Sequence, residues 1–222
     1  MVVALDEFTY KRFEYEREDS MTEIMRYFDI VKLVWNSEDI EKAVRAWMGP
    51  LTNTSRGKEL LKDVTVFTRT PASAIALFDK ALTEDRPVLE ILTEGLRYAL
   101  DEYIKLLSQR GYKLSKAKSK KWTEVWRMII SDERYRDLIA GLIRREGVKA
   151  RELSEALGTE SDWPKIAAVK YRIIERPEPL VYRFTDEFLA AAAGYAAETP
   201  SVPSAILKSM AKLYGEIGIE KT

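Results

Sequence analysis

The sequence predicts a mainly α-helical protein whose second half also contains a β-hairpin. Apolar residues recur at intervals of three and four through most of the chain, which is the period of an amphipathic helix. The pairs Gly49-Pro50 and Thr70-Pro71 lie where such stretches end and begin. Two runs rich in β-branched residues, 171–176 and 180–185, flank a Pro-Glu-Pro turn, which is typical of a hairpin.

The composition argues against catalysis. The chain has 222 residues, of which 46% are hydrophobic, and it contains no Cys and no His. Without these residues it cannot form a disulfide, a thiolate nucleophile or a Ser-His-Asp triad, and the usual zinc ligands are missing. We therefore expect no enzymatic activity, no cofactor and no metal. An enzyme with a site built from carboxylates alone is the least favoured of the three function classes considered below.

The sequence also predicts where the protein works and how stable it is. No apolar run reaches the roughly 18–20 residues that span a bilayer, so we expect no membrane partner. The N-terminal apolar residues are followed at once by Asp6 and Glu7, unlike a secretory signal, and we expect a cytoplasmic protein. The amides are limited to Asn36, Asn53 and Gln109, and this scarcity beside many charges is thermophile-like.

Capping signals predict the helices of the first half. Ser20 and Glu23 form a capping-box pattern at the start of one helix. A second helix begins near Asn36 or Ser37 and ends at Gly49-Pro50, and the run 64–68 could be a strand.

The longest helix is predicted for 87–110, after Thr70 and Pro71 have opened the helix before it. Its apolar stripe consists of Leu89, Leu92, Leu96, Leu100, Tyr103 and Leu107. The segment 113–121 resembles a solvated linker or helix entry. We place a domain boundary there, with a helical domain of unknown role at 1–112 and a second domain at 113–222.

Charge is unevenly distributed although the net charge is zero. Residues 1–50 carry seven cations and eleven acids, whereas residues 101–150 carry thirteen cations and seven acids. A lysine-rich stretch precedes Trp122 and Trp126 and contains Lys113, Lys116, Lys118, Lys120 and Lys121. It is either a secondary nucleic-acid patch with stacking indoles or, as we favour, a solvated segment before two core tryptophans.

The element order after residue 131 is helix, helix, helix, hairpin. The helices are expected at 131–146, at 149–157 and from Trp163-Pro164, with Ile166 and Val169 pointing to the core. Two helices rich in small residues follow, at 186–197 and 203–217. Because small residues allow close helix approach, we consider a homodimer through these C-terminal helices.

The segment RREGVKARELSEALGTES (144–161) resembles the first-to-second helix passage of the winged helix-turn-helix superfamily, and RIIERPEPLVYRFTDEF (172–188) resembles its strand, wing and strand. The resemblance covers roughly residues 131–198. It implies a fold of three helices with a β-hairpin wing, followed here by extra C-terminal helices. It departs from the common pattern at Trp163-Pro164, a pair that is either a base or partner contact or, as we favour, a helix start packed on the domain.

In that superfamily the third helix enters the major groove and the wing contacts phosphate or the minor groove. The resemblance therefore implies double-stranded DNA as the partner, in transcription regulation or genome maintenance. The alternative is a non-catalytic subunit whose winged helix docks a protein, and the N-terminal domain could also hold a protein partner. The implied DNA-binding residues are Lys149, Arg151, Lys165, Lys170, Arg172, Arg176 and Arg183.

Overall fold

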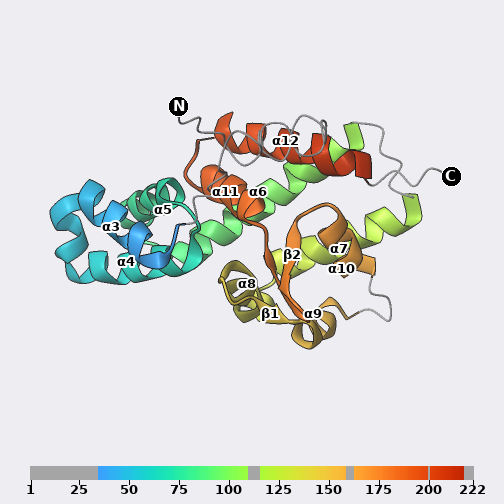
Figure 1. Ribbon diagram of the computed structural model, residues 1–222, viewed down its shortest axis with the longest axis horizontal. Coiled ribbons are helices and arrows are strands. Elements are labelled where there is room, and N and C mark those ends of the chain that lie inside the picture. The colour runs from blue at the N-terminus through green and yellow to red at the C-terminus, as the bar shows by residue number, and fades with distance from the viewer. Residues whose placement is uncertain (1–34, 110–115, 159–162, 200, 218–222) are drawn as a thin grey trace, which may run out of the picture. The chain divides into compact units, whose positions relative to one another are not determined.

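A computed structural model describes residues 35–109, 116–158, 163–199 and 201–217 (Figure 1). Over these residues the protein is mainly helical and contains a small three-stranded antiparallel sheet, which confirms the predicted fold class at this level. The capping box at Ser20 and the helix expected after it lie outside the described residues. None of the described helices is long and apolar enough to span a bilayer.

The first half of the described chain is formed by helices α3 to α6, and α7 follows them. Their bounds are α3 Ser37–Met48, the 3-10 helix η1 Gly49–Asn53, α4 Ser55–Phe67, α5 Pro71–Glu84, α6 Val88–Gln109 and α7 Lys116–Ser131.

The second half contains the sheet and the C-terminal helices. Its elements are η2 Glu133–Tyr135, α8 Arg136–Ile143, β1 Val148–Lys149, α9 Ala150–Leu157, α10 Trp163–Lys170, β2 Ile174–Glu178, β3 Val181–Phe184, α11 Asp186–Ala196 and α12 Ser201–Ile217.

Two of the predicted helix starts in the first half are confirmed by their caps. Asn36 accepts a hydrogen bond from the backbone N–H of Asp39 at 2.8 Å, and the Asp39 carboxylate accepts one in return from the N–H of Asn36. Thr70 caps α5 through Ser73, with Pro71 in the first turn as predicted. Short polar side chains at helix starts are therefore reliable signals in this chain.

The strand predicted at 64–68 is wrong, because Val64 to Phe67 continue helix α4. Leu60, Leu61 and Val64 are buried on one face of this helix. Burial of that face outweighs the weak β-preference of a short β-branched run.

The three strands form a sheet in the order β1-β3-β2. Val148 pairs with Tyr182, and Ile174 pairs with Phe184. The hairpin is confirmed, but its turn lies at Pro179 and Leu180, later than the predicted 177–179. Pro177 is tolerated inside β2 because this strand lies at the edge of the sheet, where its missing N–H is not needed.

Strand β1 was not predicted, since two residues are too short to show alternation. The helix expected at 131–146 is also shorter than predicted: a 3-10 turn precedes α8, which ends at Ile143. The chain then turns through Gly147, whose φ is +71°. A Cβ at this glycine would lie 2.5 Å from the carbonyl oxygen of Tyr182, so a glycine is needed where β1 approaches β3.

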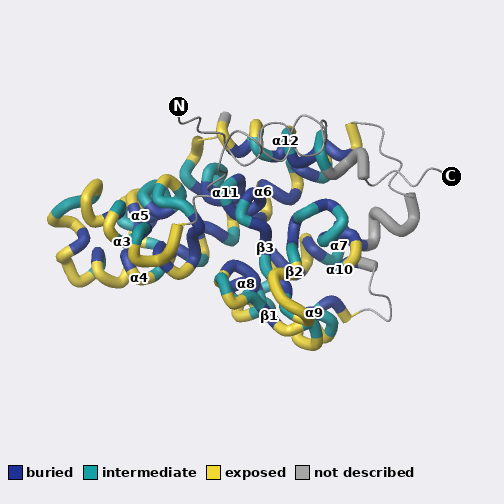
Figure 2. Tube along the Cα trace, viewed as in Figure 1, coloured by how far each residue is buried: buried dark blue, intermediate teal, exposed yellow. Residues whose placement is uncertain are grey.

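Helix α11 packs along α6 and against α12, and Figure 2 shows buried segments in both α6 and α11. A Cβ on Gly95 of α6 would lie 2.1 Å from the carbonyl oxygen of Ala192, so these two helices are in very close contact. The small residues of α11 are thus used within the chain: Ala191, Ala192 and Ala193 are all buried. They no longer give a reason to expect a homodimer through this helix.

These contacts cross residue 112, where a domain boundary was expected. The described residues from 35 onward group as one compact unit. Of the expected linker, residues 116–121 belong to the first turns of α7.

Candidate nucleic-acid interface

Helix α10 is held by its inner face on a tryptophan-rich core. The indole N–H of Trp126 donates to the carbonyl oxygen of Pro164 at 3.0 Å. The ring of Trp122 stacks on Tyr171, with centroids 5.5 Å apart. Both tryptophans are fully buried, which confirms the core interpretation and excludes their stacking on nucleobases. The side chain of Trp163 lies outside the described residues.

The outer face of α10 differs from the prediction. Its buried residues are Pro164, Ala167 and Ala168, so Ile166, expected in the core, is instead 51% exposed. Val169 is half-buried. The prediction was wrong because the buried face of α10 carries small residues rather than the large apolar ones. Lys165 and Lys170 flank the exposed isoleucine, and both are half-buried.

Arg172 shapes the turn between α10 and the hairpin. Its φ is +57°, and its carbonyl oxygen accepts a hydrogen bond from the Thr185 hydroxyl at 2.7 Å. Its guanidinium lies 3.5 Å from the Glu175 carboxylate. Because Thr185 also caps α11 through Phe188, this residue pair joins α10, the hairpin and α11.

Arg183 and Lys165 are held in a similar way. Arg183 donates from Nε to Glu175 at 2.8 Å and from Nη1 to the carbonyl oxygen of Arg145 at 3.2 Å. Lys165 lies 3.2 Å from the Ser154 hydroxyl and 5.7 Å from the ring centroid of Tyr182. These side chains connect the hairpin to the helices around it.

Of the other four candidate cations, three are exposed and Lys170 is half-buried. Lys149, Lys170 and Arg176 form no side-chain hydrogen bond or ion pair with another described residue. Arg151 pairs with Glu155 at 2.7 Å, but both side chains are mostly exposed and such pairs contribute little. Lys149 also occupies the cap position of α9, and its side chain makes no capping hydrogen bond.

The side chains of the lysine-rich stretch lie outside the described residues. Lys113 lies outside the described residues. The side chains of Lys116, Lys118, Lys120 and Lys121 also lie outside them, although their backbone belongs to α7.

Two features of this region escaped the sequence prediction. Leu180 at the hairpin turn has a φ of +64° and is 65% exposed, so it presents an apolar side chain to solvent. The dipeptide Pro179-Leu180 was a usable signal, since a turn normally carries polar residues or glycine there.

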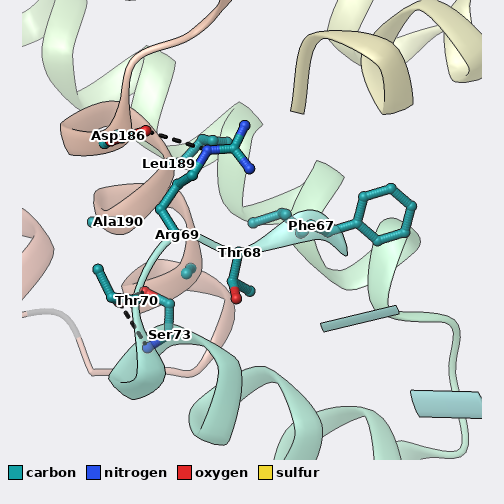
Figure 3. A pocket seen from close by; sticks show the side chains of 10 residues that line it. Phe67, Thr68, Arg69, Thr70, Ser73, Asp186, Leu189 and Ala190 are labelled. Atoms are coloured by element: carbon teal, nitrogen blue, oxygen red, sulfur yellow. Dashed lines mark hydrogen bonds and ion pairs between the residues drawn. The ribbon is translucent and has the colours of Figure 1, made fainter. Parts of the chain in front are cut away.

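The second missed feature is an ion pair between the buried side chain of Arg69 and the partly exposed side chain of Asp186. Arg69 lies 3.2 Å from the Asp186 carboxylate and donates to the carbonyl oxygen of Ile143. Figure 3 shows its guanidinium beside Asp186, turned away from Thr70 and Ser73 at the start of α5. Burial lowers the pKa of Arg69 to about 10, so it stays charged at neutral pH. A lone arginine between two helical patterns gave no sign that it would be buried.

Burial also raises the pKa of Asp186, while the nearby positive charge of Arg69 partly opposes this effect. The pocket that these residues line has a volume of about 10 Å³, room for a single water molecule. Arg69 therefore joins the α4–α5 connection to α8 and α11 rather than forming a ligand site. Within the described residues, no group of three or more acidic side chains is arranged to hold a metal ion.

Comparisons with known proteins assign the chain to no family. It matches no protein-family model, and no curated protein and no solved structure is significantly similar to it.

Proposed function

We propose that the chain binds duplex DNA as a winged-helix protein, with α10 in the major groove and the β2–β3 hairpin as the wing. The order α8, α9, α10, hairpin supports this proposal, as does the short strand β1 that completes the sheet.

The observation that carries it is the position of Lys170 and Arg176. Neither forms an ion pair with another described residue, and one lies on α10 and the other on the hairpin. Lys149 and Arg151 add positive charge at the start of α9. Four cations, on β1, α9, α10 and β2, can anchor a phosphate backbone, while the outer face of α10 meets the bases.

The test compares labelled duplex and single-stranded DNA by fluorescence anisotropy. The parent chain should bind duplex more tightly, and Lys170→Ala with Arg176→Ala should weaken duplex binding at least about tenfold at about 50 mM salt. Lys58→Ala with Lys62→Ala on α4 is the matched control, since it removes the same charge from another exposed surface. Equal losses in the two double variants would show that binding is not located at α10 and the hairpin.

The alternative is that the same surface docks a protein. The exposed side chains of Ile166 and Leu180 favour it, since desolvated apolar groups contribute more to protein contacts than to phosphate contacts. Ile166→Ser with Leu180→Ser should leave duplex affinity within about twofold if the cations carry DNA binding. Absence of duplex binding by the parent chain at about 50 mM salt would leave docking as the better account.

A further inference from the structure

An open groove lies between the end of α5, the first half of α6 and the end of α11. It has a volume of about 430 Å³. Its floor is formed by Ile91, Gly95 and Ala196, and two tyrosines, Tyr98 and Tyr195, also line it. None of its described lining residues belongs to α9, α10 or the hairpin, so it is separate from the proposed DNA surface.

The groove presents aromatic surface to solvent. Tyr98 follows Gly95 by three residues, so it lies about one turn further along the same face of α6. It is 65% exposed. Tyr195 is half-buried, and its carrier helix α11 is fixed in place by the close contact between Gly95 and Ala192. A ligand in the groove would therefore meet rings on a rigid support.

Carboxylates outnumber cations around these rings. Lys80 contacts both Glu84, at 2.7 Å, and Glu198. Arg86 contacts Glu84 at 3.2 Å, and it also contacts two carboxylates of α6, Glu90 at 2.8 Å and Glu94 at 2.6 Å. Two cations are thus shared by four carboxylates, and the local potential is negative.

We propose that this groove binds a segment of a partner protein that carries several arginine or lysine side chains. A guanidinium can stack on the face of Tyr98 while its N–H groups reach the neighbouring carboxylates. The carboxylates lie on α5, on α6 and after α11, so a chain with spaced cations matches them better than one small cation does. The proposal does not depend on DNA binding.

The test uses the full chain and a short fluorescein-labelled peptide in which arginines alternate with glycine and serine. Binding is followed by anisotropy at about 50 mM salt, and a peptide with glutamate in place of arginine should not bind. Tyr98→Ala should weaken binding about fivefold, while Tyr98→Phe should bind like the parent because the ring face remains. Tyr98 is exposed, so these variants should fold, and thermal melting checks this.

Charge is tested with a matched pair of variants. Glu198→Gln removes an exposed carboxylate of the groove and should weaken binding, whereas Glu133→Gln removes an exposed carboxylate of η2 and should not. Equal affinities of the parent and Tyr98→Ala, or equal effects of the two glutamine variants, would overturn the proposal. Displacement of the peptide by an equal concentration of spermidine would assign the groove to polyamines instead. Lys170→Ala with Arg176→Ala should retain peptide binding, which separates this result from the DNA test.

Discussion

Gly95 allows α11 to lie directly against α6, and a methyl group there would meet backbone rather than a movable side chain. We expect Gly95→Ala to lower the free energy of unfolding by at least about 2 kcal/mol. The comparison is Gly158→Ala, where φ is +56° but the nearest atom lies 4.0 Å away, so only strain of about 1 kcal/mol is added. Urea unfolding measures both losses. A smaller loss at Gly95 than at Gly158 would contradict the close contact.

Asp186 should make stability depend on pH. Its pKa in the folded chain is raised above the ordinary 3.8, so the folded state binds this proton more readily than the unfolded state. The stabilising contribution is therefore present at low pH and is lost as pH rises from about the ordinary value through the raised one. Asp186→Asn removes this dependence, so the variant should lose less stability than the parent between acid and neutral pH.

Asp132 serves as a control because its pKa is shifted in the opposite direction from that of Asp186. The Arg134 guanidinium beside it holds the pKa of Asp132 below its ordinary value, so its contribution is lost as pH falls. Urea unfolding of Asp132→Asn and Asp186→Asn across the acid range should therefore give pH-dependent differences of opposite sign relative to the parent. Differences of the same sign would contradict a raised pKa of Asp186 in the folded chain.

At the scale of elements, two arginines of the hairpin have different roles, one in stability and one in the proposed DNA binding. Arg183 ties β3 to Glu175 and to the loop after α8, so Arg183→Met should lower the free energy of unfolding by about 1.5 kcal/mol. Arg176 is exposed, and Arg176→Met should change stability by less than about 0.5 kcal/mol while weakening duplex binding. Urea unfolding and anisotropy on the same two variants check this division. Comparable stability losses would mean that the two arginines are not distinguished by the fold.

The elements also show where sequence reasoning works in this chain. Capped helices such as α3 and α5, and the left-handed stop at Gly158, follow from local hydrogen bonds and backbone conformation, and these were predictable. The orientation of α10 was not, because it depends on Trp122 and Trp126 far along the chain. For the same reason the sequence indicated seven candidate cations but could not tell that Arg183 is engaged internally.

For the whole molecule, the composition predicts resistance to heat. The chain has few amides and many charges, and three carboxylates surround Arg86. Such ion-pair networks contribute more to stability at high temperature. We expect a thermal midpoint above about 65 °C, beyond the usual range of mesophile domains. Differential scanning calorimetry measures it, and a midpoint within that usual range would remove the thermophile-like interpretation.

The whole molecule is electrically neutral, so duplex binding has to come from a local positive surface rather than from overall charge. The salt dependence of duplex affinity tests this most directly. The logarithm of the affinity of the parent chain should fall linearly with the logarithm of salt concentration, and Lys170→Ala with Arg176→Ala should reduce that slope by about 1–2. An unchanged slope in this variant, or no duplex binding by the parent at about 50 mM salt, would contradict the proposed interface.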